Sequence, residues 1–148
     1  MKTLYTGIAT AVSGREGKVE TSDQSISTTL VKPGSGGKGT NPEQLFAAGY
    51  AGCFGGAVGF LAKQRNLDVG NVAVTGEVSL NQDEDNGFVL SVTLDVALPN
   101  LAKDEAENLI HAAHQFCPYS KATRGNINVT LKLNGAPLAA GSAVGAAA

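Results

Sequence analysis

The chain has 148 residues, of which 43% are hydrophobic and 16% are charged, and its net charge is −2 at pH 7. This length suits one domain with a core of ordinary size. The near-neutral charge and the lack of a basic cluster argue against a nucleic-acid partner. The first residues, MKTLYT, do not follow the charged-then-apolar pattern of a signal peptide, so we expect a cytoplasmic protein.

The N-terminal third predicts short strands joined by turns. Residues 3–12 alternate loosely in Thr, Val and Ile, and residues 18–21 and 26–31 have the same character. The stretch 33–39, PGSGGKG, predicts a flexible loop.

A helix is expected from about residue 41 to residue 65. Thr40 and Glu43 stand three positions apart, as in a capping box, and Pro42 suits the first helical turn. Five interior glycines cost about 4–5 kcal/mol in helix propensity. We therefore expect a central helix that is buried closely against another helix. The glycines are Gly49, Gly52, Gly55, Gly56 and Gly59.

The same helix raises a membrane alternative, because residues 45–62 carry no charge. That length meets the lower limit for a spanning helix, and the spacing of Gly52 and Gly56 is found in membrane helix dimers. Alanine and glycine supply little transfer energy, however, and the sequence has no second candidate span. We expect no membrane association.

The remaining elements alternate between sheet and helix. Residues 72–80 and 88–98 flank an acidic turn and predict a hairpin, and residues 101–116 have the apolar spacing of a second helix. Pro118 should end that helix, and residues 127–133 predict a final strand. The elements indicate an α+β fold with mostly antiparallel pairing.

We place one domain over residues 1–135. Residues 136–148 read as a low-complexity tail rich in Ala and Gly, which we expect to be disordered or weakly docked.

The only two cysteines, Cys53 and Cys117, are the most informative residues. They could form a structural disulfide, half of a metal site or a redox couple, and the cytoplasm favours a transient disulfide over a permanent one. Cys53 lies in an apolar helix, where burial raises the pKa of a thiol, so a nucleophilic Cys53 needs a nearby cation. Arg15, in the turn GREG, supplies a permanently charged candidate.

Cys117 follows the C-terminal end of a helix, where the macrodipole disfavours a thiolate. It therefore suits a resolving thiol better than an attacking one. Glu43 is a candidate to anchor Arg15, in competition with its capping role. On one straight helix Glu43 lies about 15 Å from Cys53, so it must act through Arg15 or serve a partner chain.

His111 and His114 raise a zinc alternative with the cysteines. Side chains at successive three-residue steps turn progressively around a helix, so these ligands would not converge well on one metal ion. We therefore expect solvated histidines and no metal. Tyr50 and Tyr119 suit hydrogen bonding or, better, core packing. Phe46, Phe54 and Phe116 suit either a pocket for an apolar substrate or the core.

Several segments resemble the organic hydroperoxide resistance (Ohr) proteins of the OsmC/Ohr family. They are LYT at 4–6, GREGKV at 14–19, TNPEQLFAAGYAGCF at 40–54, CPYS at 117–120 and ATRGNINV at 122–129. The resemblance covers nearly the whole chain before the tail. The segment around Cys53 is long and specific, and CPYS with ATRGN favours the Ohr branch over OsmC itself.

The resemblance implies a thiol peroxidase that reduces organic hydroperoxides to alcohols without a cofactor. Cys53 matches the peroxidatic cysteine and Cys117 the resolving cysteine, which form an intramolecular disulfide. Arg15 matches the arginine that activates the thiolate, and Glu43 matches the acid that positions it.

The implied fold is an intertwined homodimer with antiparallel sheets wrapped around central helices and with its sites at the subunit interface. The implied reductant is a dithiol, notably the lipoyl group of a protein. Two departures are minor: the loop at 33–39 is short, and Gly52 replaces the more usual alanine. A non-enzymatic redox-sensing or small-ligand-binding domain is the alternative function.

Overall fold

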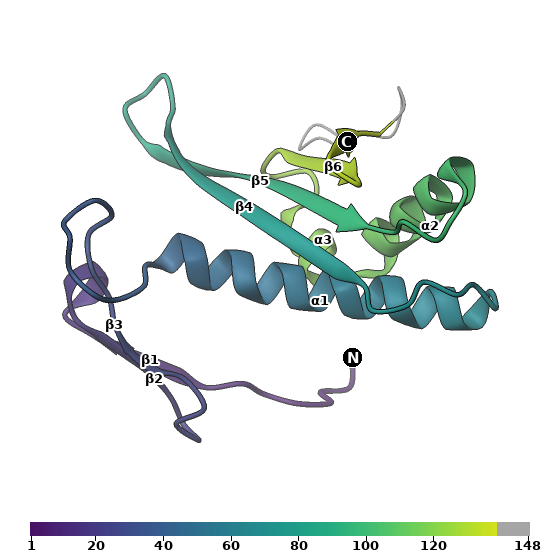
Figure 1. Ribbon diagram of the computed structural model, residues 1–148. Helices are drawn as coiled ribbons and strands as arrows, with labels where there is room; N and C mark the ends of the chain where they lie inside the picture. Colours follow the sequence, from purple (N-terminus) through teal and green to yellow (C-terminus); the bar gives the residue numbers. More distant parts are fainter. Residues whose placement is uncertain (139–148) are drawn as a thin grey trace. The chain divides into compact units, whose positions relative to one another are not determined.

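The computed structural model describes residues 1–138, which belong to two compact units that divide between Leu45 and Phe46 (Figure 1). Most of the tail predicted at 136–148 lies outside the described residues. Its first residues, Ala136–Pro137, form the short strand β7, which pairs with the preceding strand. The domain boundary at residue 135 stays a prediction.

The first unit contains a three-stranded antiparallel sheet in the order β1 (Ala9–Val12), β2 (Lys18–Thr21) and β3 (Ser27–Thr29). The strand predicted from residue 3 begins only at Ala9, because the four residues of β2 pair with Ala9 through Val12. The turn between β1 and β2 holds a 3-10 helix, η1 (Gly14–Glu16). This helix displays the Arg15 side chain.

This sheet has almost no core of its own. Of residues 1–45, all of which are described, only Leu30 is buried, while Leu4, Ile8 and Val12 are exposed. A small sheet needs an apolar surface to pack against before it is stable. The sheet therefore depends on apolar surface beyond residues 1–45.

Helix α1 (Pro42–Gln64) begins with a cap that differs from the predicted one. Asn41 Oδ1 accepts a hydrogen bond from the Gln44 backbone N–H at 2.9 Å, which is the contact of an N-cap residue. Thr40 Oγ1 donates instead to Gln44 Oε1. The expected capping box of Thr40 and Glu43 is wrong, and Glu43 is free for another role.

The second unit contains a four-stranded sheet in the order β4 (Ala73–Gln82), β5 (Phe88–Ala97), β6 (Val129–Leu133) and β7. The predicted hairpin is confirmed as β4 and β5. β6 pairs with β5 in parallel, and the other strand pairs of the described residues are antiparallel, as the expected mostly antiparallel pattern allows. The helical connection between β5 and β6 allows this, because parallel neighbours need a long crossover.

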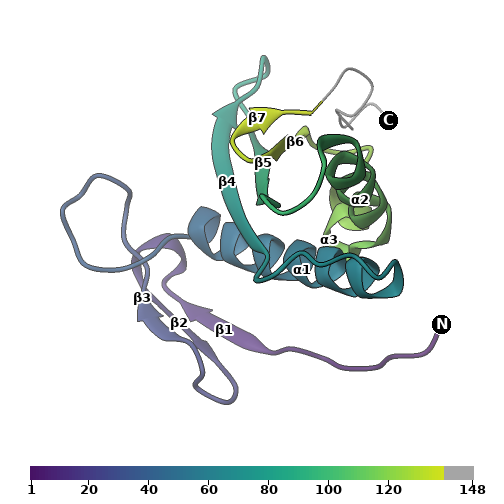
Figure 2. The same ribbon diagram turned by 45° about the vertical axis from the view of Figure 1, so that its right-hand side comes forward.

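That crossover consists of α2 (Lys103–Phe116) and α3 (Pro118–Thr123). Pro118 ends α2 as predicted, and it also begins α3, a helix that the sequence did not predict. Proline is favoured at a first helical position because its missing N–H would have no partner there. Figures 1 and 2 show α1, α2 and α3 on one face of the sheet.

The core of this unit joins α1, α2, β5 and β6. Alternate residues of β5, namely Val92, Leu94 and Val96, pack with buried side chains of the helices. The predicted burial of α1 is only partly correct. Its buried residues are Tyr50, Phe54, Ala57, Val58 and Ala62.

The other side of α1 is open within the second unit. Gly52 and Gly56 are exposed, and a Cβ built on either residue meets no atom within 4 Å. Among the described helices, α1 alone is long and apolar enough to span a bilayer, a test that core helices of soluble proteins also pass. The close packing that its glycines were expected to need is therefore not supplied on this side by residues 46–138 of the same unit.

Candidate active site

The fold brings the two cysteines into contact. Cys53 lies in the middle of α1 and is partly buried, whereas Cys117 is fully buried at the junction of α2 and α3. Both thiols are free, and Cys117 Sγ donates to Cys53 Sγ across 3.4 Å. A disulfide needs about 2.0 Å between its sulfurs, so the pair is poised for one after a small movement.

The surroundings of Cys53 within this unit do not activate it. Burial raises the pKa of Cys53, and the adjacent Cys117 raises it further. The backbone N–H of Tyr119 donates a hydrogen bond that acts in the opposite direction without reversing the shift. A reactive thiolate at Cys53 therefore requires a further positive charge, as the sequence suggested.

Cys117 occupies two helix ends at once. It is the C-cap residue of α2, where its N–H donates to Ala113 O at 2.8 Å, and it is also the N-cap residue of α3. From the sequence, only the dipole of α2 was expected to act on Cys117. The positive end of the α3 dipole faces the same residue, so the dipoles of the two helices have opposite effects on a thiolate at Cys117.

Arg15 and Glu43 form an ion pair in the first unit. Arg15 Nη2 lies 2.7 Å from Glu43 Oε2, and the Glu43 side chain is only 13% exposed. The hydrogen bond from Arg15 lowers the pKa of Glu43, and the same bond raises the pKa of Arg15. Both groups therefore stay charged at neutral pH, and of its two predicted roles Glu43 takes that of anchor for Arg15.

A buried hydroxyl cluster connects α1 to α3. Tyr50 Oη lies 2.9 Å from Ser120 Oγ and 3.1 Å from Thr123 Oγ1. Burial raises the pKa of Tyr50, which keeps the phenol protonated at neutral pH. The sequence favoured core packing for Tyr50 and indicated neither hydrogen-bond partner. The spacing could have indicated this contact. Tyr50 precedes Cys53 by three residues, and Ser120 follows Cys117 by three residues.

Aromatic rings surround this cluster. The Tyr119 ring lies 5.6 Å from that of Tyr50 and 6.2 Å from that of Phe46, and its hydroxyl passes so close to Gly49 that an added Cβ would lie 2.7 Å away. A side chain at this position would therefore require the Tyr119 hydroxyl to move. Phe54 lies in the core, whereas Phe116 is half-exposed and stacks on Phe60.

His114 is not the solvated residue that we expected. It is fully buried beside Phe54, and neither ring nitrogen has a hydrogen-bond partner among the described residues. Burial lowers the pKa of His114 to about 4, with help from the charge of Arg124. Arg124 Nη2 also donates to the His114 backbone carbonyl, which caps the end of α2. Within residues 1–138, no group of three or more His, Cys, Asp or Glu side chains could hold a metal ion.

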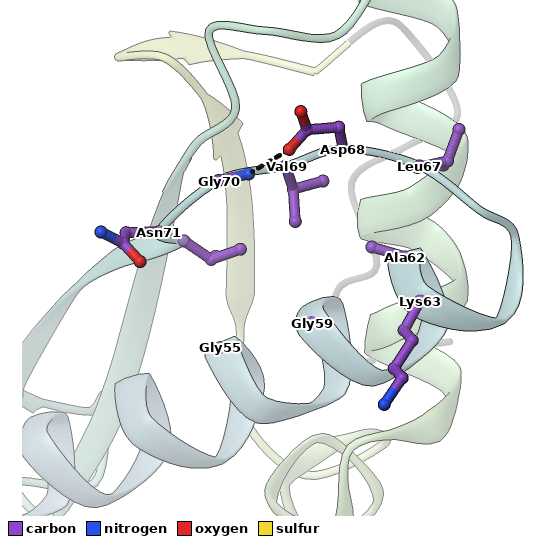
Figure 3. Close-up of a pocket in the computed structure, with 10 residues that line it drawn as sticks. Gly55, Gly59, Ala62, Lys63, Leu67, Asp68, Val69, Gly70 and Asn71 are labelled. Atoms are coloured by element: carbon purple, nitrogen blue, oxygen red, sulfur yellow. Dashed lines mark hydrogen bonds between the residues drawn. The ribbon is translucent and has the colours of Figure 1, made fainter.

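A pocket of about 570 Å³ lies between the C-terminal half of α1 and the loop that leads into β4 (Figure 3). The loop is braced by a hydrogen bond from the Gly70 N–H to Asp68 Oδ1. Neither cysteine lines this pocket. The thiol pair, rather than the pocket, is the chemically distinctive feature of the unit.

A family model described as OsmC-like protein matches residues 34–132. The chain belongs to the OsmC/Ohr family. It is 48% identical over 134 residues to the organic hydroperoxide resistance protein OhrB of Bacillus subtilis, covering 88% of this chain and 98% of the relative. It is 50% identical over 137 residues to an organic hydroperoxide resistance protein of Xanthomonas axonopodis pv. citri, covering 89% and 96%.

Solved structures of Ohr proteins support the same placement. The crystal structure of Bacillus subtilis OhrB matches with a TM-score of 0.85 and covers 89% of this chain and 100% of that chain. An organic hydroperoxide resistance protein from Legionella pneumophila, 46% identical, matches with a TM-score of 0.83 over 89% of this chain and 98% of that chain. The predicted resemblance to the Ohr branch and the OsmC-like α+β fold are confirmed.

Proposed function

We propose that this chain is a cysteine-based peroxidase that reduces organic hydroperoxides to alcohols. The observation that carries the proposal is the pair of free thiols 3.4 Å apart, one partly exposed and one buried, in a chain of the Ohr family. Peroxide reduction through a disulfide requires at least a reactive thiol that can reach a second thiol.

In the first step the Cys53 thiolate attacks the outer oxygen of the hydroperoxide. The O–O bond breaks, the alkoxide takes up a proton and leaves as the alcohol, and Cys53 becomes a sulfenic acid. Arg15 supplies the positive charge that stabilises the thiolate. This role is supported by its ion pair with Glu43, which holds the guanidinium in one place.

In the second step the Cys117 thiol attacks the sulfenic sulfur. The S–S bond forms, the S–O bond breaks, and the hydroxyl leaves as water with the Cys117 proton. A dithiol then reduces the disulfide and is itself oxidised to a disulfide. We propose that a lipoyl group on a protein is this dithiol, since its two thiols can complete the exchange within one molecule.

The substrate preference follows from the surroundings of Cys53. Cys53 packs against the apolar core, with Phe54 buried beside it in the same helix. An apolar approach favours alkyl and lipid hydroperoxides over hydrogen peroxide through burial of the substrate chain.

We also propose that the working unit is a homodimer in the cytoplasm. The first unit has one buried apolar residue, Leu30, and α1 leaves Gly52 and Gly56 uncovered. A second copy would supply both missing surfaces by isologous contact. The glycines would let the two α1 helices approach closely.

The deciding experiment compares kcat/KM for cumene hydroperoxide and for hydrogen peroxide, with dihydrolipoamide as the reductant. We expect the organic substrate to be strongly preferred and thioredoxin to replace the lipoyl dithiol poorly. Equal kcat/KM values for the two peroxides would sink the substrate assignment. Slow oxidation of Cys53 in a stopped-flow experiment would favour a redox sensor instead.

A further inference from the structure

Tyr50 links the helix that carries Cys53 to the helix that follows Cys117. Its hydroxyl bonds to Ser120 Oγ at 2.9 Å and to Thr123 Oγ1 at 3.1 Å, and all three side chains are buried. Residues three apart on a helix share a face. The hydroxyl contact and the thiol contact are therefore neighbouring connections between the same two segments of chain.

Helix α3 depends on tertiary contacts to hold its place. It is only six residues long, and so short a helix is marginal without tertiary contacts. Thr123 Oγ1 also donates to the carbonyl oxygens of Tyr119 and Ser120, which extends the cluster into the backbone of α3.

We propose that Tyr50 is a positioning residue for disulfide formation, holding α3 so that Cys117 Sγ stays within reach of Cys53 Sγ. The proposal rests on the proposed peroxidase function. The sulfurs stand 3.4 Å apart and must close to about 2.0 Å, so a loosened α3 directly lowers the frequency of productive encounters. The chemistry of the step is unchanged: Cys117 attacks the sulfenic sulfur of Cys53, and water leaves.

The test is a single-turnover reaction of the reduced Tyr50→Phe variant with one equivalent of cumene hydroperoxide, quenched at intervals with dimedone. We expect Cys53 to be oxidised at the wild-type rate. Disulfide formation should slow about tenfold, which is the effect expected from losing one buried hydrogen bond. The amount of dimedone adduct should increase correspondingly, because the sulfenic acid persists longer. Ser120→Ala should behave alike, and the double variant should be no slower than the slower single variant.

Tyr5→Phe removes the same hydroxyl from a tyrosine that is 84% exposed, and it should form the disulfide at the wild-type rate. A lowered melting temperature in Tyr50→Phe with an unchanged ratio of sulfenic acid to disulfide would make Tyr50 merely structural and overturn the proposal.

A second measurement separates this proposal from the proposed function. Equilibration of each variant with reduced and oxidised dithiothreitol reports the effective concentration of Cys117 at Cys53 and requires no peroxide. Tyr50→Phe should lower that effective concentration about tenfold. A wild-type value overturns the role of Tyr50. Failure of the wild-type protein to react with any hydroperoxide overturns the proposed function, while the dithiothreitol equilibrium still reports on Tyr50.

Discussion

Cys117 Sγ lies 3.4 Å from Cys53 Sγ although 64 positions separate the two residues in the chain. Cys53 is partly exposed and Cys117 is fully buried. Because Cys53 is the more accessible thiol, we propose that it meets the substrate first, which is the order that the sequence suggested.

Replacing each cysteine should therefore affect peroxide consumption differently. Cys53→Ser should abolish peroxide consumption, because no other described thiol reaches solvent. Cys117→Ser should consume about one equivalent of peroxide and stop at the sulfenic acid, which dimedone traps. Peroxide consumption measured against enzyme concentration distinguishes the two, and continued turnover by Cys53→Ser would refute the assignment.

Arg15 should control the ionisation of Cys53. Burial raises the pKa of Cys53, and the proposed role of Arg15 is to offset that shift. Arg15→Ala should move the pH profile of Cys53 alkylation by iodoacetamide to higher pH by about one unit, which means about tenfold less thiolate at a fixed pH. Glu43→Gln should give a smaller shift in the same direction, because the substitution releases the Arg15 guanidinium that the Glu43 carboxylate holds.

The matched control is Arg65→Ala, which removes an exposed arginine at the end of α1. Its alkylation profile should coincide with that of the wild-type protein. An unchanged profile in Arg15→Ala would remove Arg15 from the site.

His114 should make the folded state sensitive to acid. Its pKa is lowered from about 6.5 in the unfolded chain to about 4 by burial, so the unfolded state binds a proton first as the pH falls. Stability should be constant above about pH 6.5 and should decline between about pH 6.5 and pH 4. Urea unfolding at pH 7.5, 6 and 5 measures this decline.

His114→Leu should flatten the pH dependence in that window, whereas His111→Gln should leave it in place. Glu43 acts at lower pH. Its lowered pKa contributes stability that is present above its ordinary value near 4.3 and is lost only as the pH falls through the lower folded value. An equally steep decline in His114→Leu would show that another group is responsible.

Gly56 tests the proposed dimer. A Cβ at this residue meets no described atom within 4 Å, so in an isolated chain Gly56→Ala should stabilise α1 by about 1 kcal/mol. Against a closely packed second α1, the added methyl group should instead cost about 1–3 kcal/mol of association. Sedimentation over a range of concentrations measures the dissociation constant of the dimer.

Asn108→Ala on the exposed face of α2 is the control, since it also improves helix propensity. It should leave the dissociation constant unchanged. A Gly56→Ala variant that is more stable and associates equally well would place the dimer contact elsewhere.

Local patterns were sufficient for most of the elements. Alternation identified the β4–β5 hairpin and apolar spacing identified α2, because those periods follow from backbone geometry alone. A helix-start signature at residues 40–43 identified α1. The pattern was insufficient for α3 and for the cap of α1. Six residues carry too little periodicity, and both Thr40 and Asn41 have side chains able to cap.

The sequence by itself predicted a functional role for both cysteines, ranked them as the attacking and the resolving thiol, and proposed Arg15 with Glu43 as their partners. These predictions depend on residue type, because the chemistry of a thiol or a guanidinium follows from the side chain itself. Only the tertiary structure placed Cys117 against Cys53, gave Glu43 to Arg15, buried His114 and joined Tyr50 to Ser120. Contacts across many positions depend on how whole elements pack, which no local spacing encodes.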